Sequence, residues 1–120
     1  MVIQSFKDLI VWQRSMTLAQ DVYQFVSTLP SLERYCLADQ MRRCAVSIPS
    51  NIAEGKKRGT RKEFAHFLRI AQGSAAELET QLLLAEGIHH LNIAKILIVL
   101  IEVQKMLSTI IRKLGTSDFR

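Results

Sequence analysis

Apolar residues recur every three or four positions along almost the whole chain, and this spacing constrains the fold more than any other feature. Such spacing places apolar side chains on one face of an α-helix. Only two prolines and five glycines interrupt the 120 residues, which is too few for a protein built of many short strands. Since 48% of the residues are hydrophobic, a sizeable core is available. The sequence therefore predicts an all-α fold in one domain, residues 1–120.

Four helical segments are predicted, at about residues 6–28, 33–57, 61–88 and 92–114. Ser5 with Asp8 resembles a capping box before the first segment, and Thr60 with Glu63 forms one before the third. The other boundary signals are Pro30, a loop over Gly55–Gly59, Asn92 and Gly115. Short connections between long amphipathic helices favour antiparallel neighbours, which gives an up-down four-helix bundle.

The apolar seams show which side of each helix is expected to face the core. In the second segment the seam keeps its phase through Pro49, so we predict one helix kinked at this proline, not two short helices. That seam consists of Leu37, Met41, Cys44, Ile48, Ile52 and Gly55. The seam predicted for the first segment consists of Leu9, Trp12, Met16, Ala19, Val22, Tyr23 and Val26. The seam predicted for the third segment consists of Phe64, Phe67, Leu68, Ala71, Ala75, Leu78, Leu82 and Ala85.

The fourth segment is apolar on all sides between Ile96 and Ile101. A single bundle buries only one side of such a helix, and a wet second side would be an unusually large apolar patch. We therefore expect this helix to pack on another subunit. The alternative is a helix covered by loops and tails of its own chain.

No targeting or membrane segment is apparent in the sequence. The stretch Met1–Asp8 lacks the basic-then-apolar pattern of a signal peptide, and the longest apolar run is far short of the ~20 residues of a membrane span. Cys36 and Cys44 would lie roughly 12 Å apart on one helix, too far to form a disulfide within it. Free thiols fit a reducing compartment, so a cytoplasmic protein is expected.

The titratable residues include one pattern that can bind metal in helical bundles. Two Glu-x-x-His pairs occur, Glu63 with His66 and Glu86 with His89, but about 34 Å of helix separates them, so they cannot converge on one metal. No Gly-rich phosphate loop, nucleophile elbow or zinc spacing is present. We therefore predict no catalytic, cofactor-binding or metal-binding residues and no enzymatic activity.

The net charge of +5 is concentrated in the middle of the chain, where nine basic residues between positions 34 and 69 face three acidic ones. Such a cluster before a helix start favours salt-sensitive, sequence-independent contact with RNA or DNA phosphates. The alternative is a solvated charged loop. The leading candidates are Lys56, Lys57, Arg58, Arg61 and Lys62, and the second choices are Arg42, Arg43 and Arg69.

Polar residues also form stripes beside the apolar seams. On the second segment the stripe is Gln40, Arg43, Ser47, Asn51, Glu54 and Arg58, and on the third it is Ser74, Glu77 and Gln81. We expect the stripes to meet, with Arg43 facing Glu77 or Glu79. A polar layer that fixes helix register explains them, and a ligand pocket, as in an enzyme or small-molecule binder, is the alternative.

Several of these stretches together resemble one protein family. They are Phe6–Leu9, Val11–Gln13, Gln40–Gly55 with its Ser-Ile-Pro-Ser-Asn-Ile-Ala-Glu-Gly run, Glu63–Phe64, Phe67–Leu68 and Ala71–Glu79. The family is the four-helix-bundle family of proteins encoded in intervening sequences of large-subunit ribosomal RNA genes. It is related to the accessory variability proteins of diversity-generating retroelements. Cys36 and Cys44 depart from the usual Gly and Ala of the family.

The resemblance implies a homopentamer with an RNA- or DNA-associated role, and the retroelement relatives bind a reverse transcriptase. Two functions are therefore weighed. The first is a pentameric accessory protein that binds nucleic acid through the basic loop. The second is a structural or adaptor oligomer that recruits a protein partner and has no direct role with nucleic acid.

Overall fold

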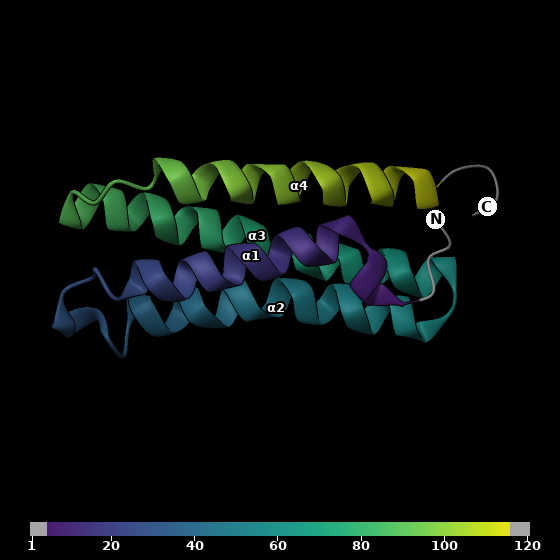
Figure 1. Ribbon diagram of the computed structural model, residues 1–120, viewed down its shortest axis with the longest axis horizontal. Helices are drawn as coiled ribbons and strands as arrows, with labels where there is room; N and C mark the ends of the chain where they lie inside the picture. Colours follow the sequence, from purple (N-terminus) through teal and green to yellow (C-terminus); the bar gives the residue numbers. More distant parts are fainter. Residues whose placement is uncertain (1–4, 116–120) are drawn as a thin grey trace.

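Four α-helices run up and down along one long axis (Figure 1). The computed structural model describes residues 5–115, and it contains no strand within that range. The α-helices are α1 (Ile10–Val26), α2 (Leu37–Arg58), α3 (Arg61–His89) and α4 (Ala94–Leu114). Two short 3-10 helices, η1 (Phe6–Asp8) and η2 (Ser31–Glu33), precede α1 and α2. The predicted all-α bundle is thereby confirmed.

Helices that follow each other in the chain lie side by side, and α4 returns to close against α1. The molecule measures 48 × 23 × 23 Å, so the helices are nearly as long as the bundle. At one end, on the right in Figure 1, lie the turn between α2 and α3 and the end of α4. At the other end lie the connections from α1 to α2 and from α3 to α4.

The core consists of side chains contributed by all four helices. The largest that are fully buried are Leu18, Val22, Met41, Ile48, Ile52, Leu68, Leu78, Leu82, Leu100, Val103 and Leu107. The members of this list that belong to α2 and α3 all lie on the seams predicted for these two helices. Burying a side chain of this size contributes about 1.5–3 kcal/mol, so the bundle is held together mainly by this apolar column.

The seam predicted for the first helix was right at Ala19, Val22 and Val26, which are buried, but wrong by one position before them. Tyr23 is exposed, whereas Val11, Ser15 and Leu18 are buried. Apolar residues occupy two adjacent faces of α1, so spacing alone did not separate them. A polar residue is tolerated inside because the Ser15 hydroxyl donates a hydrogen bond to the Trp12 carbonyl at 2.8 Å.

Two helix boundaries also differ from the prediction. The capping box of Ser5 and Asp8 is present, but it caps η1, and an extended residue, Leu9, separates η1 from α1. The second helix begins at Leu37, not near Glu33, because η2 occupies the expected first turn.

The loop expected over Gly55–Gly59 is not formed, because α2 continues to Arg58. A Cβ atom at position 55 would lie 2.7 Å from the Phe67 Cβ, so Gly55 serves close helix packing. Gly59, with φ +91°, makes the turn instead. Pro49 lies inside the unbroken helix α2, which confirms one helix, while the kink itself stays a prediction.

None of the helices in residues 5–115 combines the length and apolar character that a bilayer crossing requires.

Candidate nucleic-acid interface

A turn of two residues brings the end of α2 and the start of α3 together. Gly59 adopts a left-handed conformation that ends α2, and Thr60 then caps α3. The Thr60 hydroxyl accepts a hydrogen bond from the Glu63 backbone N–H at 3.1 Å and donates one to the Glu63 carboxylate at 3.3 Å. The reciprocal backbone bond of a complete capping box is absent among the hydrogen bonds of this turn. This geometry gathers the predicted cluster at one end of the bundle.

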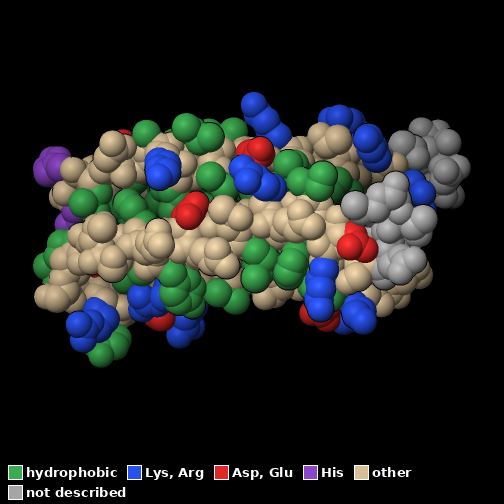
Figure 2. Space-filling model, in the orientation of Figure 1, with side chains coloured by type: hydrophobic (Ala, Val, Ile, Leu, Met, Phe, Trp, Pro, Cys, Tyr) green, Lys and Arg blue, Asp and Glu red, His purple; other side chains and the backbone are tan. Residues whose placement is uncertain are grey.

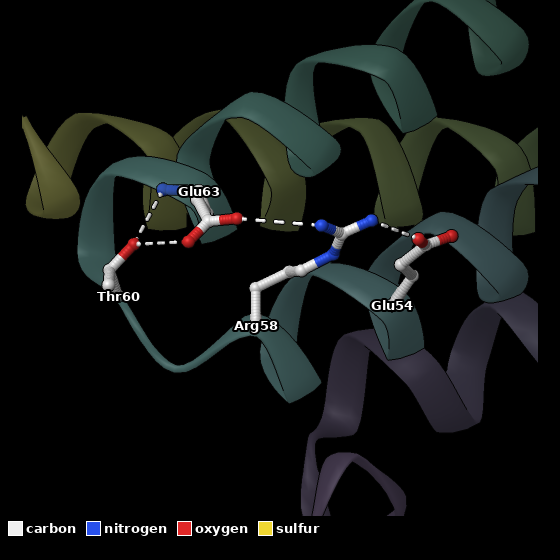
Figure 3. Close-up of polar contacts among 4 residues, drawn as sticks. All are labelled: Glu54, Arg58, Thr60 and Glu63. Atoms are coloured by element: carbon white, nitrogen blue, oxygen red, sulfur yellow. Dashed lines mark hydrogen bonds and ion pairs between the residues drawn. The ribbon is translucent and has the colours of Figure 1, made fainter.

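Within this cluster, Arg58 lies between two carboxylates (Figure 3). Its guanidinium is 2.7 Å from the Glu54 carboxylate and 3.7 Å from that of Glu63. The hydrogen bond to Glu54 is the main reason why the pKa of Arg58 lies above its ordinary value. The same guanidinium lies 5.0 Å from the centre of the Phe67 ring. Arg58 therefore bridges α2 and α3 and is poorly placed to bind an anion.

The lysines of the cluster are placed differently. The Lys56 ammonium lies 5.8 Å from the centre of the Phe64 ring, which holds it near the surface of α3. Lys57 and Lys62 are exposed, and neither has an ion-pair or hydrogen-bond partner for its side chain within residues 5–115. These two side chains are the ones most available to a phosphate.

The end of α4 enlarges the basic cluster with two residues that the sequence reasoning missed. The Arg61 guanidinium donates a hydrogen bond to the Lys113 carbonyl at 3.2 Å, which places the start of α3 beside the end of α4. Arg112 and Lys113 occupy the last turn of α4. We define the basic end as the set Lys56, Lys57, Arg58, Arg61, Lys62, Arg112 and Lys113, which the carboxylates of Glu54 and Glu63 oppose.

The second-choice residues do not join the basic end. Arg69 lies on an exposed part of α3, about two turns beyond Lys62. Arg42 and Arg43 lie near the start of α2, roughly 24 Å along the helix from Arg58. Figure 2 accordingly shows Lys and Arg side chains gathered in separate groups over the two ends of α2. The eight predicted residues are thus divided between the two ends of the molecule, with Arg69 apart.

The polar stripes of α2 and α3 do meet, as predicted. The Ser47 and Ser74 hydroxyls are 2.7 Å apart, and the Asn51 amide donates to the Ser47 hydroxyl at 3.0 Å. The predicted pairing of Arg43 with Glu77 or Glu79 was wrong. Arg43 lies 3.2 Å from Asp39, four residues earlier on its own helix, and the Glu79 carboxylate accepts from Gln104.

Cys44 lies in this polar layer beside the core. Its thiol lies 3.8 Å from the Glu77 carboxylate, and the Gln81 amide nitrogen lies 3.4 Å from the sulfur. Burial is the main cause that raises the pKa of the Cys44 thiol, and the carboxylate of Glu77 adds to it. A thiol in this state is a poor nucleophile at neutral pH. The layer therefore behaves as helix packing and offers no reactive group.

The histidines and acids offer no metal site in the described part of the chain. His89 bonds Glu33 of η2 at 2.6 Å, and this contact ties the end of α3 to the connection before α2. Within residues 5–115 no three side chains of His, Cys, Asp or Glu gather closely enough to hold a metal ion.

A second surface of interest is a groove between α1 and α4. It has a volume of about 940 Å³ and is lined mostly by apolar side chains. Ile98 is 70% exposed and Ile10 is 63% exposed, and Ile101 lies beside them. No loop within residues 5–115 covers these isoleucines. The buried side of the same helix carries Ile96 and Leu100, so α4 is apolar on both sides, as its sequence predicted.

The fold and its surfaces define a small four-helix-bundle protein with a basic end and an open apolar groove. Comparison with family models then identifies its relatives. Residues 7–111 match the family described as 23S rRNA-intervening sequence protein, and the chain belongs to this family. Comparison with curated proteins finds no match. The resemblance drawn from the sequence is thus confirmed for the intervening-sequence family, while the link to retroelements stays a prediction.

Proposed function

We infer that this protein is a non-enzymatic, self-assembling helical bundle that binds the phosphate backbone of RNA or DNA through its basic end. The observation that carries the inference is the composition of that end. Seven basic side chains oppose two carboxylates, and Lys57 and Lys62 are exposed without a partner in the described chain. A surplus of this kind attracts polyanions largely without regard to base sequence.

Helix stability alone does not explain this composition. Cations in the last turn of a helix are favoured by its dipole, and this accounts for Lys56 and Lys57 on α2 and for Arg112 on α4. The first turn of a helix has the opposite preference, yet Arg61 and Lys62 lie there on α3. A bound phosphate would offset that cost, because it would accept hydrogen bonds from the same helix start.

Assembly through the α1/α4 groove supports the same function. Ile10, Ile98 and Ile101 are exposed side by side in this groove, and contiguous exposed apolar side chains are typical of interaction sites. A second copy is the occupant we propose, since the opposite side of the bundle exposes Ile70, Leu84 and Ile88 on α3. Two different surfaces of one chain that bind each other head to tail form a closed ring when the rotation between copies closes, and an open filament when it does not. The resemblance implies five copies, and a ring would present several basic ends to one nucleic acid.

Charge reversal at the two unpartnered lysines tests the interface. The variant Lys57→Glu with Lys62→Glu leaves the contacts of Arg58 intact, so a loss of binding would not reflect a broken turn. We expect its affinity for single-stranded RNA at low salt to fall about tenfold or more, with a shallower salt dependence. The single variants Lys62→Glu and Lys95→Glu form a matched pair, because both alter the net charge equally but Lys95 lies at the far end, on α4.

The measurement is a titration of labelled RNA and duplex DNA at two salt concentrations. Equal affinities for the wild type and the double variant would refute the basic end as the binding surface. That result would favour the adaptor function, in which the assembled bundle recruits a protein. A reverse transcriptase as that partner stays a prediction from the resemblance.

A further inference from the structure

A pocket at the opposite end of the bundle has no part in the function proposed above. It has a volume of about 590 Å³ and lies between the end of α1, the segment that leads to α2, and the start of α2. Val26, Leu29 and Ala38 are buried and form an apolar floor. Tyr23, which is 51% exposed, stands beside this floor. The pocket thus combines buried apolar side chains with polar and charged ones.

Two arginines line the same pocket, and no carboxylate neutralises them. The Arg42 guanidinium donates only a long hydrogen bond, 3.4 Å, to the Arg34 carbonyl. Neither arginine forms an ion pair with any of residues 5–115. The pocket therefore carries uncompensated positive charge.

The acids that flank these arginines in the sequence are held elsewhere. Glu33, next to Arg34, bonds His89 of α3 at 2.6 Å. Asp39, one turn before Arg42 on α2, lies 3.2 Å from Arg43 instead. Each carboxylate that could neutralise the pocket is thus engaged by another cation or imidazole, and the two guanidiniums are left for an external anion.

The chemistry of the pocket selects a particular class of anion. A guanidinium matches the oxygens of a phosphate better than it matches a halide or a neutral group. An apolar floor beside a tyrosine ring suits a flat, weakly polar body, such as a nucleobase, which stacks on aromatic side chains. Inorganic phosphate would bind the arginines but would leave the apolar floor exposed to water. An apolar ligand would use the floor but would desolvate the arginines without compensation.

We propose that this pocket binds a nucleotide, with the base on the floor beside Tyr23 and the phosphate at Arg34 and Arg42. The nucleotide is either free or the terminal residue of a single strand, since both present the same groups. Binding of a terminal residue rests on the proposed function, because it makes the pocket a recognition site for the end of a bound nucleic acid. Binding of a free nucleotide does not depend on the basic end.

Titration with adenosine 5′-monophosphate, followed by the amide resonances of the protein, tests the proposal. We expect saturable shifts around the floor, and weaker binding of both adenosine and inorganic phosphate. Arg42→Gln should weaken nucleotide binding about tenfold, since it removes one charge-assisted contact. The matched control is Arg69→Gln, because this exposed arginine of α3 does not line the pocket and holds none of the carboxylates near it. Should Arg42→Gln unfold, Tyr23→Leu reports the stacking contact on a folded chain.

The proposal would be overturned by the absence of nucleotide binding, or by equal weakening in Arg42→Gln and Arg69→Gln. Inorganic phosphate that binds as tightly as the nucleotide would also refute the nucleotide class. The variant Lys57→Glu with Lys62→Glu separates this site from the basic end, because it should lose RNA affinity and still bind the mononucleotide. RNA with and without a 5′-phosphate then distinguishes the sources. A preference for the phosphorylated end that Arg42→Gln removes supports the terminal residue, and equal affinities support the free nucleotide.

Discussion

The two helix pairs on opposite sides of the bundle, α2 with α3 and α1 with α4, are packed in contrasting ways. Between α2 and α3 a glycine and small residues allow close approach, as at Gly55 against Phe67 and at Ser47 against Ser74. Between α1 and α4 the surface opens into a groove of about 940 Å³ with exposed isoleucines. The Arg14 guanidinium donates a hydrogen bond of 2.6 Å to the Glu102 carboxylate, and this ion pair joins α1 to α4.

This difference in packing indicates that a single chain packs one side of the bundle more closely than the other. Between α2 and α3 the interior leaves little space and joins most of its polar groups to one another, although the Gln81 Oε1 atom is buried without a hydrogen-bond partner among the described residues. The α1/α4 side buries Leu100 but exposes Ile98, two residues earlier on the same helix. We attribute these exposed isoleucines to assembly with a second copy, as proposed above.

Truncation in the core of the closed side should have the largest effect on stability. Leu78→Ala removes a fully buried side chain of α3 and is expected to lower the free energy of unfolding by about 2–5 kcal/mol. Leu83→Ala is the control, because this leucine of the same helix is 49% exposed, and its loss should cost about 0.5 kcal/mol or less. Urea unfolding measures both, and equal costs would contradict the placement of α3.

Close helix packing at Gly55 gives the next largest effect. Gly55→Ala introduces a Cβ atom 2.7 Å from the Phe67 Cβ, so we expect a loss of about 1–3 kcal/mol in the free energy of unfolding. Gly73→Ala is the matched helical control, since no atom lies within 4 Å of its Cβ position. It should stabilise the protein by about 0.5–1 kcal/mol. If both variants were stabilised alike, the tight contact between α2 and α3 would not exist.

The smallest expected effect concerns the thiols and leaves stability at neutral pH unchanged. Since burial raises the pKa of Cys44 in the folded state, its thiolate is scarcer at pH 7 to 8 than that of an ordinary cysteine. Iodoacetamide should therefore alkylate exposed Cys36 first and Cys44 only slowly, as mass spectrometry would show. The stabilisation from the protonated Cys44 is present below its unfolded pKa and is lost as the pH rises through the folded one. Rapid alkylation of both thiols would mean that α2 and α3 separate readily.

Helix content and the seams of α2 and α3 could be predicted from the sequence, because the spacing of apolar residues indicates both the helix and its buried face. The seam of α1 could not, since two adjacent faces are apolar and Ser15 is buried through a local hydrogen bond. Arg112 and Lys113 could have been found, because an up-down order places the end of α4 beside the start of α3. The unpaired state of Arg34 and Arg42 could not, because it depends on the distant contact of Glu33 with His89.

Assembly through the α1/α4 groove, which gathers the basic ends, is the central claim, and one experiment tests it most directly. The mass of the wild type and of Ile98→Glu would be measured by light scattering, with RNA affinity determined in the same buffer. Gln20→Glu, a charge on an exposed part of α1 away from the groove lining, is the control. The account predicts a wild type several times heavier than 13.7 kDa, a folded monomeric Ile98→Glu, and an RNA affinity about tenfold or more lower in that variant. A wild type that is itself monomeric, or an Ile98→Glu variant that assembles and binds RNA like the wild type, would contradict it.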